Sequence, residues 1–141
     1  MNFDFITERL AVGQKIDNQE FADALKAAGI THAVNLFGEA EPVWAGPSLS
    51  FPSPQDDDGT PRRPEVVLAC VRYAFDAIRD GGKVYVHCQW GIGRAPSVAY
   101  AILRRFGLTR EEAAALVNAK RPRAATWGWE KYIPSIEDAL A

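Results

Sequence analysis

A cysteine and an arginine separated by five residues, two of them glycine, are the residues of this chain best suited to chemistry. Cys88 and Arg94 enclose the segment Gln89, Trp90, Gly91, Ile92 and Gly93, and His87 directly precedes the cysteine. Arginine presents a planar fork that grips two oxygens of a phosphate, and glycine allows backbone angles and close approaches that a side chain forbids. A thiolate in such a phosphate site is a nucleophile aimed at phosphorus. We therefore predict phosphoryl chemistry at Cys88.

The flanking sequence predicts that this segment joins a strand to a helix. Residues 83–87 are β-branched and aromatic, and apolar residues recur at helical intervals after Arg94 until Gly107. Backbone N–H groups at a helix start bind anions, and the same amides and helix dipole favour the thiolate form of a cysteine. The alternative interpretation is a buried cysteine in a glycine-rich turn, and the placement between strand and helix argues against it.

Strands alternate with helices along the rest of the chain. We expect a short hairpin or two small edge strands over residues 5–12, a helix over 17–28, a buried strand over 30–37 and a helix over 64–80. We also expect a helix after Thr109 and a last amphipathic helix from about Trp127. Six of the nine prolines lie between residues 38 and 64, which excludes a long helix or an interior strand there. The pattern predicts one α/β domain over residues 1–141, with a central, mostly parallel sheet of about four to five strands flanked by helices.

Composition limits the class of protein. The 141 residues carry 16 Lys+Arg and 18 Asp+Glu, a net charge of -2, without a long basic run, so nucleic acid and membrane surfaces are not expected partners. No apolar run reaches the length of a membrane span, and the N-terminus does not resemble a signal peptide. Two cysteines are too few for a disulfide framework or a Cys-rich zinc site. We expect a cytoplasmic monomer that needs no metal or cofactor.

The signature His-Cys-x5-Arg, from His87 to Arg94, resembles the protein tyrosine phosphatase superfamily. The short length, residues 6–13 and residues 25–36 are similar to small dual-specificity phosphatases. The loop spelling Gly-Arg-Ala-Pro over residues 93–96 and Asp-Asp-Gly over 57–59 resembles the phosphatase-of-regenerating-liver branch, although the basic tail and prenylation motif of that branch are missing. The resemblance implies a cysteine-dependent phosphatase with a phosphocysteine intermediate. Its substrate would be a phosphorylated protein, with phosphotyrosine, phosphoserine or phosphothreonine, or a small phosphomonoester.

A general acid must protonate the leaving oxygen in this chemistry. Three aspartates, Asp56, Asp57 and Asp58, precede a Gly-Thr-Pro sequence. In the family that the chain resembles, the acid lies about thirty residues before the nucleophile and directly ahead of a turn to proline, which favours Asp58 over Asp57 and leaves Asp56 last. Clustered carboxylates also raise one another's pKa. The alternative is that all three are solvated turn residues.

Two residues depart from the family pattern. Ala95 stands where the family usually has Ser or Thr, whose hydroxyl is thought to stabilise the departing cysteine sulfur, so the resemblance implies slow hydrolysis of the phosphocysteine. Ser97 lies two residues further on and is expected to be a small helix-packing residue. Trp90 is bulky where small residues are common: its indole either narrows the pocket and offers a stacking face, or packs under the proline-rich loop.

The remaining candidates have supporting or structural roles. By resemblance, His87 helps to hold the nucleophile, although it could instead be a buried core histidine. Cys70 falls among the apolar residues of its helix and is expected to pack in the core, with a reversible disulfide to Cys88 as the alternative. Glu39 and Glu41 are expected to be solvated. Two rival functions stay open, namely a phosphate-binding or partner-binding module of low activity, and an arsenate reductase or rhodanese-like thiol enzyme.

Overall fold

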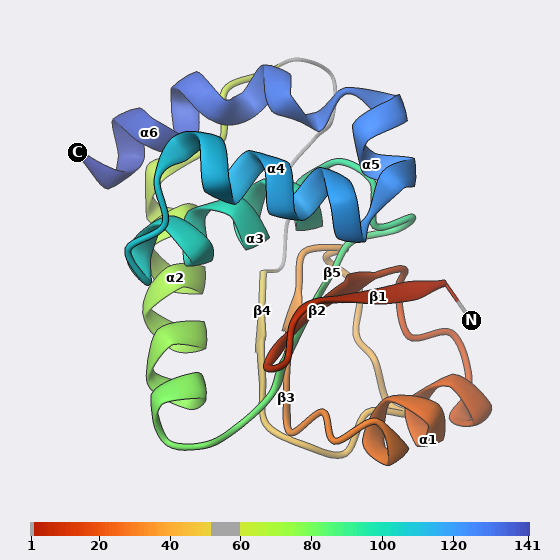
Figure 1. The fold of residues 1–141 in the computed structure, drawn as a ribbon. Coiled ribbons are helices and arrows are strands. Elements are labelled where there is room, and N and C mark those ends of the chain that lie inside the picture. The colour runs from red at the N-terminus through yellow and green to blue at the C-terminus, as the bar shows by residue number, and fades with distance from the viewer. Residues whose placement is uncertain (1, 52–59) are drawn as a thin grey trace.

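A five-stranded sheet forms the centre of the molecule (Figure 1). The structure is a computed structural model and describes residues 2–51 and 60–141. The strands, in chain order, are β1 (Phe3–Thr7), β2 (Leu10–Gly13), β3 (His32–Asn35), β4 (Ser48–Ser50) and β5 (Val84–His87). They lie side by side in the order β1-β2-β5-β3-β4, with only the β1–β2 pair antiparallel. The predicted α/β architecture with a mostly parallel sheet is confirmed.

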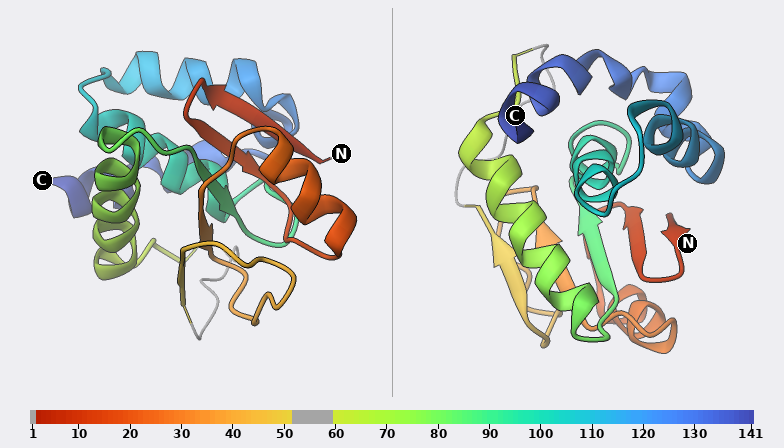
Figure 2. Two further views of the ribbon diagram at one scale, coloured as in Figure 1. Left: turned by 90° about the horizontal axis from the view of Figure 1, so that it is seen from below. Right: turned by 60° about the vertical axis from the view of Figure 1, so that its left-hand side comes forward.

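Helices cover both faces of this sheet (Figures 1 and 2). They are α1 (Gln19–Ala27), α2 (Pro64–Arg79), α3 (Arg94–Arg105), α4 (Arg110–Lys120), α5 (Pro122–Trp127), the 3-10 turn η1 (Trp129–Tyr132) and α6 (Ile133–Leu140). Figure 1 shows α1 on one side of the sheet and the later helices on the other. In the described parts of the chain, no helix combines the length and apolar character needed to span a membrane.

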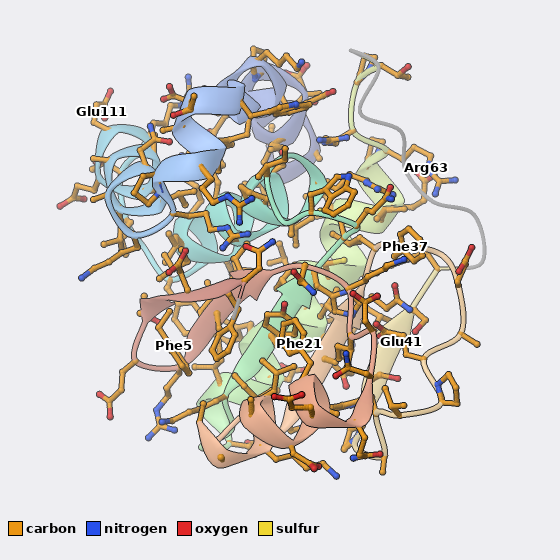
Figure 3. The ribbon with its side chains drawn as sticks, turned by 90° about the vertical axis from the view of Figure 1, so that its right-hand side faces the viewer. Phe5, Phe21, Phe37, Glu41, Arg63 and Glu111 are labelled. Carbon is orange, nitrogen blue, oxygen red and sulfur yellow. The ribbon has the colours of Figure 1, made fainter. Side chains whose placement is uncertain are left out.

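The two faces of the sheet have separate cores because successive strand residues point to opposite sides. In β5, the valines Val84 and Val86 join the large core under α2, α3, α4 and α6, whereas Tyr85 joins the smaller core under α1. Phe21 from α1 packs in that smaller core with Tyr85, and Figure 3 labels it between α1 and the strands. Both faces of β5 are therefore buried, as expected for a central parallel strand.

Several elements differ from the sequence-based expectation. The helix predicted from about Trp127 is not continuous. Trp127 ends α5, Gly128 adopts a left-handed φ of 92°, and the rest is divided into η1 and α6, which has a proline in its first turn. α1 is capped by Asn18, whose side chain accepts the Phe21 N–H. The predicted helix after Thr109 is confirmed as α4, and Thr109 and Glu112 form a capping box at its start. The proline-rich stretch contains β4, at the edge of the sheet, where few ladder bonds are needed.

One partly buried polar cluster joins the C-terminal helices to α3. Glu137 of α6 accepts hydrogen bonds from the Tyr100 hydroxyl (2.6 Å) and from Arg104 Nε (2.9 Å), both on α3. It also pairs with Arg110 at the start of α4 (3.1 Å). The hydrogen bond from Arg104 is the main cause that lowers the pKa of the Glu137 carboxyl from 4.5 to about 2. This cluster fixes the helical layer behind the loop that follows β5.

Candidate active site

The predicted phosphate loop emerges from the middle of the sheet. β5 ends at His87, Cys88 follows with only 1% of its surface exposed, and α3 begins at Arg94. β5 is paired with parallel strands on both sides, β2 and β3, so the loop starts where the carboxyl ends of three strands meet. Ligands of open α/β sheets bind at such an edge. The structure thus brings Cys88 and Arg94 together at one edge of the sheet, as predicted.

Three successive carbonyls of the loop are bonded on its outer side. The Gln89 carbonyl accepts the Lys15 backbone N–H (3.2 Å), and the Trp90 and Gly91 carbonyls accept Nη2 and Nε of Arg121 (3.0 and 2.9 Å). In a planar trans peptide, the carbonyl and the following N–H point in opposite directions. The N–H groups of residues 90, 91 and 92 therefore point away from Lys15 and Arg121. Successive N–H groups turned to one side form an anion-binding concavity.

Gly91 is required by the loop geometry. Its φ is +72°, in the left-handed region that side chains disfavour. A Cβ there would lie 2.5 Å and 2.6 Å from the carbonyl carbon and oxygen of Gly13, and 2.7 Å from Nη2 of Arg121. The loop therefore packs directly on the backbone at the end of β2, which leaves no room for a methyl group.

Arg94 is held at the same edge by a neighbouring strand. Its side chain is on the first residue of α3, the residue is only 9% exposed, and Nη1 donates to the Leu36 carbonyl (2.9 Å) just after β3. The Leu36 N–H in turn donates to the His87 carbonyl (2.8 Å). A buried guanidinium with a fixed orientation can bind two oxygens of a phosphate in a planar, bidentate manner.

His87 forms a buried pair that the sequence did not predict. Its Nε2 lies 2.8 Å from Oε1 of Glu41, and Oε2 of Glu41 accepts the Ile16 N–H (3.0 Å). The His87 side chain is fully buried and that of Glu41 is 10% exposed, so the expectation of a solvated Glu41 is wrong. In Figure 3, Glu41 and Phe37 lie together on the loop after β3. The pair fixes the imidazole directly before the nucleophile.

Arg121 is the second site residue that sequence reasoning missed. It is 1% exposed and follows α4, and besides the two loop carbonyls it bonds Asp4 Oδ2 (3.0 Å) and Asn2 Oδ1 (2.6 Å). Asp4 lies in β1 and Asn2 lies just before this strand, whereas Trp90 and Gly91 belong to a loop some thirty positions earlier in the chain than Arg121. An isolated arginine after a helix has no periodicity or motif that would reveal such a role.

The other candidates fall into two groups. Trp90 is 57% exposed, which favours an indole at the surface of the loop over one buried as a packing anchor. Ser97 is fully buried, and its hydroxyl donates to the Gly93 carbonyl (2.7 Å) within the helix, consistent with a packing role. Burial raises the pKa of Cys70 to about 12, and both cysteines are free thiols, which favours core packing for Cys70. Asp56, Asp57 and Asp58 lie outside the described residues.

Comparison with known proteins agrees with this geometry. The family model "Dual specificity phosphatase, catalytic domain" matches residues 12–127, which include the whole loop. The chain belongs to this family. Among curated relatives of this dual specificity phosphatase domain, dual specificity protein phosphatase 1 of Arabidopsis thaliana is 32% identical over 73 residues, or 50% of this chain and 37% of that protein. A putative tyrosine phosphatase of Invertebrate iridescent virus 3 is 27% identical over 132 residues, or 82% of this chain and 52% of that protein.

Solved structures match this dual specificity phosphatase domain over nearly its whole length. Tk-PTP in its active form is 26% identical with a TM-score of 0.79, covering 98% of this chain and 95% of that one. Human DUSP28 is 24% identical with a TM-score of 0.79, covering 100% and 97%, and shares the fold. The chain spans about half or less of the length of the curated relatives it matches. The finer likeness to the phosphatase-of-regenerating-liver branch stays a prediction.

Proposed function

We propose that residues 1–141 act as one phosphatase domain that hydrolyses phosphomonoesters through a phosphocysteine. The observation that carries the proposal is the loop after β5, where a buried Cys88 and Arg94 share one edge of the sheet and three successive carbonyls are bonded outward. Family membership supports the same chemistry. The substrate we propose is a phosphorylated protein, with phosphotyrosine first, or a small phosphomonoester.

The proposed reaction has two steps. The Cys88 thiolate attacks phosphorus in line and forms the S–P bond, while the bond from phosphorus to the leaving oxygen breaks and Asp58 gives that oxygen its proton. The loop N–H groups and the Arg94 guanidinium bind the other phosphate oxygens, which carry the charge in the transition state. Water, with Asp58 as base, then cleaves the S–P bond and releases inorganic phosphate and the thiolate. Catalysis in this scheme depends on positioning and charge stabilisation.

Ala95 makes the second step the slow one in this proposal. It is the second residue of α3 and fully buried, and it supplies no hydroxyl to the sulfur that leaves phosphorus. We expect a burst of released alcohol or phenol, equal to one per enzyme, before a slower steady state. In Ala95→Ser the steady-state rate should rise and the burst should shrink. An unchanged steady-state rate, with no burst in the parent protein, would contradict this role.

Hydrolysis of an aryl phosphate in the presence of EDTA tests the proposal. We expect Cys88→Ser to abolish turnover and Asp58→Asn to lower it strongly for a phenol of high pKa, but less for a phenol that leaves without a proton. Asp57→Asn is the matched control, one residue away with the same change of charge, and should keep most of the activity. Full activity of Cys88→Ser would refute the mechanism, and the reverse ranking of the two aspartate variants would assign the acid to Asp57.

Ala95 also supports one alternative, a phosphate-binding or partner-binding module of low activity. A stoichiometric phosphocysteine that never turns over would favour that alternative. Sustained release of inorganic phosphate over many turnovers would favour the enzyme. The cytoplasmic location and the monomeric state stay predictions. Size-exclusion chromatography with light scattering tests the monomeric state.

A further inference from the structure

Arg121 has a set of partners that a merely structural arginine would not need. Its guanidinium donates to two adjacent carbonyls of the phosphate loop, those of Trp90 and Gly91, and to side chains of Asn2 and Asp4. The guanidinium is 1% exposed, so its bonds to the loop carbonyls are shielded from water, whereas its carboxylate partner Asp4 is 43% exposed. A cation in such a place is stable only when its charge and donors are satisfied, which Asp4 and the carbonyls achieve together.

The bonds from Arg121 determine how two peptide groups of the loop are turned. Nη2 takes the Trp90 carbonyl at 3.0 Å and Nε takes the Gly91 carbonyl at 2.9 Å. Because the peptide is planar and trans, each bond turns the next N–H, that of residue 91 or 92, to the opposite side of the loop. The neighbouring Gln89 carbonyl is bonded by the Lys15 backbone instead, so its orientation does not depend on this side chain.

We propose that Arg121 is a positioning residue of the phosphate site, and that the N-terminal strand holds it in place through Asp4. In this role Arg121 does not contact the phosphate itself, but it orients two of the backbone N–H groups that bind the phosphate. Without its two donors, the Gly91 carbonyl would lose its bond from Nε, and the Trp90 carbonyl would keep only the longer bond from Asn2 Nδ2 (3.4 Å), so both peptide planes would be held less firmly. The phosphate would then lose up to two charge-assisted hydrogen bonds. This inference rests on the proposed function of the loop.

Binding of inorganic phosphate and of tungstate to Cys88→Ser protein tests the proposal without any need for turnover. In this background, isothermal titration should show Arg121→Met to bind both anions about 10- to 100-fold more weakly, the loss expected for one to two hydrogen bonds to a charged group. Arg121→Lys keeps the charge but cannot make both fork bonds, so it should lose about as much. Asp4→Asn leaves the arginine in place and should lose less, about two- to fivefold.

Arg104→Met is the matched control. Arg104 also donates from its guanidinium to a carboxylate and to a backbone carbonyl, those of Glu137 and Leu108, but it contacts no loop residue. The Arg104→Met variant should have a lower midpoint of thermal unfolding but an unchanged affinity for phosphate and tungstate. In proteins with Cys88 intact, the Arg121 variants should raise KM for an aryl phosphate more than the Arg104 variant does.

Each outcome has one meaning. Parent-like anion affinity in folded Arg121→Lys and Asp4→Asn proteins would overturn the positioning role, even if Arg121→Met fails to fold. Failure of both anions to bind the Cys88→Ser protein itself would count against the proposed phosphate site and not against Arg121 alone. Equal loss of affinity in the Arg104 and Arg121 variants would reduce the effect to general destabilisation and would also overturn the proposal.

Discussion

Replacement of Gly91 by alanine tests the close packing of the phosphate loop on β2. A left-handed φ of +72° costs an L-residue about 1–2 kcal/mol. The new Cβ would also meet the carbonyl carbon and oxygen of Gly13 at 2.5 Å and 2.6 Å, which are backbone atoms that cannot turn aside. Relief of such a clash costs a further ~1–3 kcal/mol. We therefore expect Gly91→Ala to lower the free energy of unfolding by about 2–5 kcal/mol.

Gly107 offers a control that separates strain from clash. Its φ is +98°, also left-handed, but a Cβ there would meet nothing within 4 Å. It lies just past the other end of α3, so Gly107→Ala should introduce backbone strain without a clash. We expect this variant to lower the free energy of unfolding by about 1 kcal/mol, because alanine also restricts the unfolded chain and so offsets part of the strain. Chemical denaturation at pH 7 gives both free energies of unfolding.

Anion binding gives the second readout for this pair. Gly91→Ala must displace both the end of β2 and the Arg121 guanidinium, or move the loop itself, so it should also weaken phosphate binding, whereas Gly107→Ala should not. Two results together would contradict the close approach of the loop to Gly13. The free energies of unfolding of the two variants would differ by less than about 0.5 kcal/mol, and Gly91→Ala would bind phosphate like the parent protein.

Three further predictions follow from buried groups. Glu41→Gln keeps the shape of the side chain that pairs with His87 but removes its charge, so kcat/KM for an aryl phosphate should fall; a parent-like kcat/KM would show that the pair has no role in the reaction. Glu137, whose pKa falls from 4.5 to about 2, stabilises the fold fully above pH 4.5 and loses this contribution as the pH falls towards 2. Glu137→Gln should therefore cost about 1–2 kcal/mol at pH 7 and much less at pH 2.5, measured by urea denaturation. Because its pKa is about 12, only about one Cys70 in ten thousand is thiolate at pH 8. Iodoacetamide should leave Cys70 unmodified in native protein and label it once the protein is unfolded in urea, and a Cys70 adduct in the mass spectrum of native protein would show that its burial is incomplete.

Local patterns in the sequence predicted the part of the site that is local in the chain. The strand before Cys88, the glycines and the helix that begins at Arg94 are consecutive, so residue types and spacing were sufficient to place them. The sheet and the main helices followed from alternation and helical periodicity. β3 proved shorter than predicted, His32–Asn35 within the expected 30–37, because apolar residues continue beyond the ladder bonds.

The supporting contacts could not be predicted in the same way. Glu41 reaches His87 across 46 positions, and Arg121 reaches Gly91 across 30. Nothing near either residue marks it as buried, since charged residues in loops and after helices are usually solvated. Only the three-dimensional arrangement of β2, β3 and β5 brings them to the loop. The split of the C-terminal helix was missed for a different reason, since apolar spacing continues across Gly128 while the backbone there turns left-handed.

The bonds between Arg121 and the N-terminus have a consequence for the order in which the protein matures. Asn2 and Arg121 are separated by 119 positions, close to the whole length of the chain. Chains are made from the N-terminus, and contacts between distant positions close late because of their entropic cost. A growing chain could complete the β1–β2 hairpin and β5 while the phosphate loop still lacked its outer support. Because residues after Arg121 also complete the core that supports α3, phosphate affinity would appear only as the last helices dock.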